Sequence, residues 1–276
     1  MQPAQFSRTA WSVAAHRAAH QVLEGGSIFR DPFARVILGP DADTIIAERS
    51  APDARPLRLF VATRARFAED SLGLAVQRGV RQAVVLGAGL DTLALRNPHS
   101  GLVIFEADHP ATQEFKRGCL ERAGLSPPGC LRFTPIDFES ENLIDGLGKA
   151  GLDFSLPAFF IWLGVVPYLT REAISLTLAG IASLPDAEIV FDYSEPLENY
   201  APEARVRVRR MAERAAAAGE PWLSYFDPAE LASLLALHGF DDVEDLGPAE
   251  FAARYFGQPD QSRRAGPHIV RARKRL

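Results

Sequence analysis

The stretch VVLGAGLDT, residues 84–92, decides the fold because a β-branched run passes there into a glycine turn and then into a helix start. The strand-like run begins at Gln82 and ends at Gly87. Glycines at positions 87 and 89 let the backbone bend sharply and let a ligand approach closely. The same design serves dinucleotide-binding domains, so Gly-x-Gly alone does not identify the ligand.

Further short apolar runs follow this turn, and helical stretches separate them. The additional strands are predicted over residues 102–107, 131–135, 158–162 and 188–193, and near 242–245 and 267–273. Helical stretches are predicted over 110–123, near 140–149 and over 171–183. Strands that alternate with helices indicate a parallel sheet covered on both faces. We therefore predict a doubly wound, mostly parallel, seven-stranded α/β sheet.

Two segments outside the sheet are predicted to be accessory. Residues 1–80 read as an N-terminal helical cap, with helices over 11–24, 32–38 and 56–77. Residues 202–217 form an arginine- and alanine-rich helix without a strong apolar face, which is typical of an exposed helix. That helix could cover a cleft, as part of a lid near 194–226.

Composition narrows the class of protein. The 276 residues suffice for one large core, so we expect a single domain over 1–276 with its sheet in 81–276. A net charge of −5 lacks the basic excess of a nucleic-acid binder. No signal peptide or membrane span is predicted, because the most apolar segment, 154–170, is short and contains prolines. Two cysteines without a CxxC pair, and no HExxH, predict a cytoplasmic protein without a metal site.

The residues after the glycine turn favour a ligand without phosphates. The third glycine of the dinucleotide fingerprint is absent, and Leu90, Asp91 and Thr92 follow instead. A carboxylate at a helix start occupies the site that a phosphate would use. S-adenosylmethionine (SAM) has no phosphate and fits this turn. Asp91 can equally be an N-cap, and a nicotinamide-dependent oxidoreductase remains an alternative, although no Tyr-x-x-x-Lys pair is present.

Acidic residues end the next two predicted strands. Asp108 lies about twenty positions past the turn, where a carboxylate suits the ribose hydroxyls. We expect Glu106 to face the other side of the strand, so that only one of the two acids binds. Asp137 and Phe138 end the third strand and suit an adenine amino group and ring. Ligands of such sheets lie across the carboxyl ends of the strands, so these residues predict a nucleoside site.

Taken together, these segments resemble the leucine carboxyl methyltransferase family, which includes bacterial polyketide O-methyltransferases. The resemblance covers about residues 17–193, and it rests on TRARF (63–67), LGAGLDT (86–92), EADHP (106–110), DF (137–138) and WLGVVPYLT (162–170). It implies a class I, Rossmann-like, SAM-dependent O-methyltransferase. The acceptor would be a small-molecule carboxylate or hydroxyl. Neither nucleic acid nor membrane is an expected partner.

The resemblance also implies which residues bind SAM. An arginine pairs with its carboxylate, glycines lie under its methionine part, one acid binds the ribose, an Asp-Phe pair contacts the adenine, and a second cation reaches in from the N-terminal segment. The matching positions here are Arg64, Gly87, Gly89, Asp108, Asp137, Phe138 and Arg17.

One position departs from the family pattern. Leu163 stands where the family usually has a glutamate that resembles a SAM contact, and leucine cannot pair with an ammonium group. Either another acid replaces it or SAM binds more weakly. If the missing acid matters, Leu163→Glu should tighten SAM binding. A SAM-binding protein without transferase activity is therefore a second alternative.

The expected chemistry needs little from side chains. SAM carries an electrophilic methyl group, so catalysis consists mainly of holding an acceptor oxygen in line with the C–S bond. A carboxylate acceptor needs no base, whereas a phenol would benefit from one. Tyr168 is the first candidate for substrate contact and Tyr193 the second, although Tyr168 suits core packing nearly as well. His109 is expected to begin a helix rather than act as a base.

Overall fold

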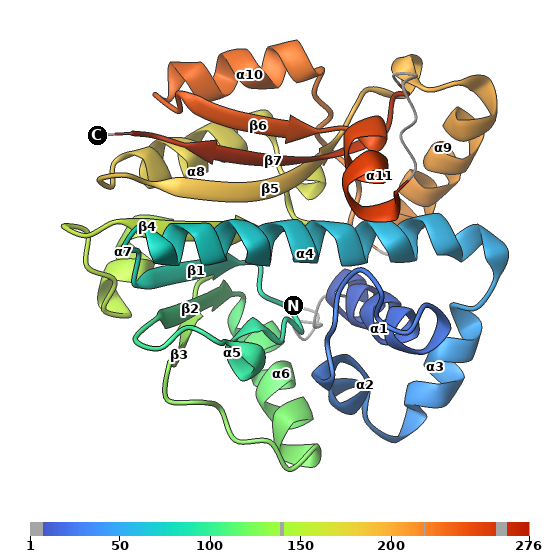
Figure 1. The fold of residues 1–276 in the computed structure, drawn as a ribbon, viewed down its shortest axis with the longest axis horizontal. Helices are drawn as coiled ribbons and strands as arrows, with labels where there is room; N and C mark the ends of the chain where they lie inside the picture. The colour runs from blue at the N-terminus through green and yellow to red at the C-terminus, as the bar shows by residue number, and fades with distance from the viewer. Residues whose placement is uncertain (1–7, 139–140, 218, 258–263, 276) are drawn as a thin grey trace.

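The computed structural model describes residues 8–138, 141–217, 219–257 and 264–275, and it contains the expected seven-stranded sheet (Figure 1). The strand order is β3-β2-β1-β4-β5-β7-β6. Strand β7 runs antiparallel to both of its neighbours, and the other paired strands are parallel. The strands are β1 Gln82–Leu86, β2 Val103–Asp108, β3 Leu131–Pro135, β4 Ala158–Trp162, β5 Glu188–Ser194, β6 Asp242–Leu246 and β7 Pro267–Arg273.

Helices cover both faces of this sheet. Successive residues of β1 point to opposite faces, so Val84 and Leu86 join one apolar cluster while Ala83 and Val85 join the other. The first cluster packs against α7 (Leu143–Lys149), α8 (Arg171–Ala182) and α10 (Pro228–Leu237). The second packs against α4 (Arg55–Gln77), α5 (Leu93–Arg96) and α11 (Pro248–Phe256), and Figure 1 shows α4 running across that face. The doubly wound class is therefore confirmed.

The N-terminal segment forms the expected helical region. It contains α1 (Arg8–Leu23), α2 (Phe33–Leu38) and α3 (Ala42–Glu48), and a third apolar cluster joins it to α6 (Pro110–Arg122). Four alanines of α1 are fully buried, and their small side chains let the neighbouring backbone approach closely: Ala14, Ala15, Ala18 and Ala19. Short 3₁₀ turns at Gly39–Asp41 and Pro52–Ala54 flank α3.

The segment after β5 extends over the carboxyl end of β4. A 3₁₀ turn at Leu197–Asn199 leads into α9 (Pro202–Ala217), which has no buried residue among its described positions, as its sequence predicts. The chain then returns to the 3₁₀ turn Val166–Tyr168, where the Leu223 N–H donates to the Pro167 carbonyl at 2.6 Å. None of the described helices is long and apolar enough to cross a membrane.

Candidate functional site

The glycine turn after β1 is closed in by two neighbouring segments. Gly87 and Gly89 both have positive φ, at 64° and 50°. A Cβ atom added at Gly89 would lie 2.7 Å from the Cβ of Ala10 in α1, and one added at Gly87 would lie 2.5 Å from Cγ2 of Val165. The turn therefore needs glycine for its backbone conformation and for the space that α1 and the loop after β4 leave.

Asp108 lies directly beside this turn. Its Oδ2 accepts a hydrogen bond from the Gly89 N–H at 2.5 Å, and its Oδ1 accepts one from the His109 N–H at 2.7 Å. Burial raises the pKa of this carboxyl, against the effect of the two backbone donors. Each carboxylate oxygen keeps a further lone pair, so Asp108 can hold the turn and still accept from a hydroxyl group.

Glu106 lies two residues before Asp108 on β2, so the two side chains project from the same face and the expectation of opposite faces is wrong. The side chain of Glu106 is instead occupied by a partner from α6. It is 1% exposed and pairs with Lys116 of α6, with Oε2 and Nζ 2.5 Å apart. Burial raises its pKa, although the Lys116 charge opposes the shift. His109 is the N-cap of α6, because its Nδ1 accepts from the Ala111 N–H at 3.2 Å. Both residues therefore have structural roles.

Arg64 of α4 reaches the carboxyl end of β4. Its Nη1 lies 2.8 Å from Oδ2 of Asp192 on β5, and both side chains are buried. A Cβ atom added at Gly164 would lie 2.7 Å from Nη2 of Arg64, so the guanidinium lies directly against the turn after β4. Nε and Nη2 donate to no protein acceptor within the described part of the chain, and they remain for another anion.

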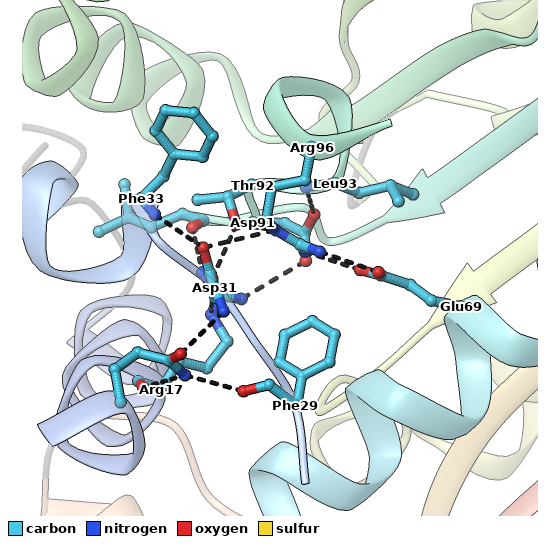
Figure 2. A network of polar contacts seen from close by, with 11 residues as sticks. Arg17, Phe29, Asp31, Phe33, Glu69, Asp91, Thr92, Leu93 and Arg96 are labelled. Carbon is cyan, nitrogen blue, oxygen red and sulfur yellow. Dashed lines mark hydrogen bonds and ion pairs between the residues drawn. The ribbon is translucent and has the colours of Figure 1, made fainter. Parts of the chain in front are cut away.

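Arg17 belongs to a buried network that joins the cap to the glycine turn (Figure 2). Its Nη2 donates to the Leu90 carbonyl at 2.5 Å, and its Nε lies 3.2 Å from Oδ2 of Asp31. Its Nη1 lies 3.4 Å from Oδ2 of Asp91. Although burial opposes the shift, the charges of Arg17, Lys116 and Arg96 hold the pKa of Asp91 below its usual range. Arg17 thus fixes the turn, and a direct contact with SAM stays a prediction.

Asp31 is the centre of this network. It is fully buried, and its carboxylate also accepts from Thr92 Oγ1 at 2.7 Å and lies 3.4 Å from Nε of Arg96. Arg96 in turn pairs with Glu69 of α4 through two contacts of 2.6 and 2.8 Å. Figure 2 shows these side chains converging from the cap, the turn and α4. The sequence predicts only a helix over 32–38 beside Asp31, and no local pattern indicates this network.

The remaining predicted residues do not all reach the glycine turn. Asp137 is half-buried and Phe138 is exposed, and their adenine contact stays a prediction. Tyr168 is half-buried at the turn after β4. Tyr193 is 1% exposed, and its hydroxyl donates to Asp245 of β6 at 2.7 Å. Its ring stacks on His268 with centroids 4.8 Å apart, so the packing of Tyr193 favours a core role.

His16 is a buried polar residue that the sequence did not single out. It is 5% exposed, and its Nδ1 has no hydrogen-bond partner among the described residues. Burial, followed by the charges of Arg49, Arg58 and Arg64, lowers its pKa to about 4. An alanine-rich helix gives no local signal for such a position, because the arginines come from distant segments.

The pH dependence of stability should reveal His16. The folded protein keeps the imidazole neutral, whereas the unfolded chain binds a proton below about pH 6.5, so stability falls between pH 6.5 and 4. Between pH 7 and pH 5, His16 should lower the free energy of unfolding by about 2 kcal/mol. Urea unfolding at both pH values measures this loss of stability. The loss should be smaller in His16→Gln than in the unchanged protein by that amount. Equal losses in the two proteins would contradict the assignment.

Comparisons with known proteins identify the family of this chain. The family model of leucine carboxyl methyltransferase matches residues 10–182. YktD of Bacillus subtilis (strain 168), classed by inference as a SAM-dependent methyltransferase, is 37% identical over 224 residues, which cover 76% of this chain and 73% of YktD. A relative of the same description from Mycobacterium avium (strain 104) is 33% identical over 277 residues, covering 90% of this chain and 87% of the relative.

Solved structures support the fold alone. A DUF574 family protein from Streptomyces avermitilis MA-4680 superposes with a TM-score of 0.54 at 18% identity, covering 94% of this chain and 97% of that protein. An O-methyltransferase family protein from Burkholderia thailandensis gives a TM-score of 0.51 at 14% identity, covering 96% of this chain and 72% of that protein. Both similarities are structural, and neither carries a substrate over to this chain.

Proposed function

This chain belongs to the leucine carboxyl methyltransferase family of SAM-dependent enzymes, and from that premise we propose that it methylates an oxygen of a small-molecule acid or alcohol. The observation that carries the proposal is the meeting of three groups at the carboxyl ends of the strands. Gly89 bends the backbone, and Asp108 lies within hydrogen-bond distance of it. Arg64 presents donors beside β4 that have no partner among the described residues.

The residues fit SAM as a ligand. The donors Nε and Nη2 of Arg64 suit its methionine carboxylate, because a guanidinium offers parallel N–H groups to a carboxylate. Asp108 has lone pairs for the ribose hydroxyls, and Gly87 and Gly89 form the positive-φ bend that brings the backbone to Asp108. SAM supplies an activated methyl group when bound. The chain's own contribution is to hold the acceptor oxygen in line with it and to exclude water.

Carboxylates are the acceptor class that this site favours. The acids at the strand ends are already engaged, because Asp108 accepts from two backbone N–H groups and Asp192 from Arg64 and Gly164. His16, with its pKa lowered to about 4, is a weak base. An acceptor that is ionised at neutral pH needs no proton removal, whereas a phenol does. Tyr168 and the returning segment at Leu223 are proposed to border the acceptor.

Labelled SAM tests this function directly. The protein is incubated with methyl-labelled SAM and a panel of aromatic acids and phenols. We expect label in carboxylic acids as methyl esters, which alkali hydrolyses to volatile methanol, whereas methyl ethers of phenols resist alkali. Calorimetry with NAD and NADP should give no binding, and binding of either without SAM binding would support an oxidoreductase. SAM binding without transfer to any acceptor would support a SAM-binding protein that lacks transferase activity.

Asp108→Ala should weaken SAM binding about tenfold, because the variant loses a charged acceptor for ribose hydroxyls and frees the Gly89 N–H. Calorimetry with SAM and with 2′-deoxy-SAM measures this loss, which should be smaller for the deoxy compound. An affinity for SAM equal to that of the unchanged protein would remove Asp108 from the site.

A further inference from the structure

We infer that Asp192 takes the place of the family glutamate that is missing at position 163, and that it orders Arg64 and the turn after β4 for the methionine end of SAM. This inference rests on the proposed placement of SAM beside Arg64. In this role Asp192 is a positioning residue that also supplies the negative charge that Leu163 cannot.

The contacts of Asp192 join the two groups concerned. Its Oδ2 lies 2.8 Å from Nη1 of Arg64, and its Oδ1 accepts from the Gly164 N–H at 2.6 Å. Gly164 directly follows Leu163, so the carboxylate reaches the same turn from β5 that a glutamate would reach from within the turn. The side chain of Asp192 is 5% exposed and that of Arg64 is 9% exposed, so solvent screens the pair weakly.

The packing of Leu163 agrees with a transfer of the acidic role from position 163 to Asp192. The leucine side chain packs against the apolar cluster on the α4 face of the sheet, together with Phe159 and Ile161 of β4. An acid at that position would have to leave the cluster or be buried in it, which is costly. Leu163 is partly buried and extends the apolar cluster, and the charge at this turn comes from the neighbouring strand.

The charge pattern suits the methionine end of SAM, which carries a carboxylate and an ammonium group. Arg64 offers donors to the carboxylate, and Asp192 gives the adjacent region a negative charge that favours the ammonium. Without Asp192, Arg64 would be a buried cation with no counter-charge and no fixed orientation. The pair therefore matches a zwitterion better than Arg64 alone.

Two ligands separate this role from a general structural one. SAM contains the amino-acid end, whereas 5′-methylthioadenosine has the same nucleoside without it. We expect Asp192→Asn to raise the Kd for SAM at least about tenfold, on the scale of one charged hydrogen bond, and to leave the Kd for methylthioadenosine within about twofold. Asp192→Ser, whose hydroxyl can still accept from the Gly164 N–H, should give the same split. Methylthioadenosine binding also shows that each variant is folded.

Glu188→Gln is the matched control. Glu188 lies at the opposite end of the same strand, is 1% exposed and pairs with Arg78 and Arg271. Its loss should lower the melting temperature and leave both Kd values unchanged. Leu163→Glu in the unchanged background should not tighten SAM binding, because the site already has its acid.

The outcomes are distinct. Equal weakening of both ligands by Asp192→Asn and Asp192→Ser, no weakening of either, or tighter SAM binding in Leu163→Glu would each overturn the inference. If the unchanged protein binds methylthioadenosine but not SAM, the placement of SAM beside Arg64 fails and the inference fails with it. If it binds neither compound, the proposed function itself fails.

Discussion

Arg64→Met should weaken SAM binding strongly and should also destabilise the fold. The variant removes the donors proposed for the methionine carboxylate, which should raise the Kd about 10- to 100-fold. It also leaves the Asp192 carboxylate buried without its cation, which costs about 3–5 kcal/mol. Calorimetry with SAM and urea unfolding measure the two effects separately.

Arg66→Met is the control for that variant. Arg66 lies on the same helix and pairs with Asp70, but both side chains are about half exposed, at 48% and 47%. An exposed pair contributes about 1 kcal/mol or less, so stability and SAM affinity should hardly change. Retention of SAM affinity by Arg64→Met would show that the carboxylate lies elsewhere.

Asp31→Asn should produce the second large effect, although Asp31 is not proposed to touch SAM. The change removes the negative charge between two arginines. The Asp31 carboxylate lies 3.2 Å from Nε of Arg17 and 3.4 Å from Nε of Arg96. Breaking a buried charge network in this way costs about 3–5 kcal/mol. SAM affinity should fall about tenfold, because Arg17 would no longer hold the Leu90 carbonyl and the glycine turn in place.

An exposed acid of the cap provides the comparison for this loss. Asp43 pairs with Arg35, and their side chains are 77% and 55% exposed. Asp43→Asn should change the unfolding free energy by no more than about 0.5 kcal/mol. Unfolding curves for the two variants, recorded with and without SAM, measure the difference. Similar small effects in both would mean that the network around Asp31 does not stabilise the turn.

Much of the sheet could be predicted because its signals are local. The run from Ala83 to Leu86 is apolar throughout, and the structure buries every one of its residues between the two helical layers. A strand that is covered on both faces is a nearly continuous apolar run in any sequence. The strand bounds are therefore close to those expected, and the glycine turn lies where the pattern placed it.

The partners of the site residues could not be predicted in the same way. Arg64 and Asp192 are 128 positions apart, and Thr92 lies 61 positions from Asp31. No periodicity connects such pairs, since each arises from the way the strands and the cap come together. Arg17 illustrates the limit: the resemblance singled it out, but its two carboxylate partners and its carbonyl partner emerged only from the fold.

The place of β7 in the sheet affects how the chain can fold during synthesis. Strand β7 is made after β6 but lies between β5 and β6, so that residue 188 pairs with residue 273 (Figure 1). While the ribosome is still making residues 195–266, β5 has an unpaired edge, which is the kind of surface that recruits strands from other nascent chains. Chaperone protection should therefore matter most during that interval, after the glycine turn and its neighbours have already left the exit tunnel.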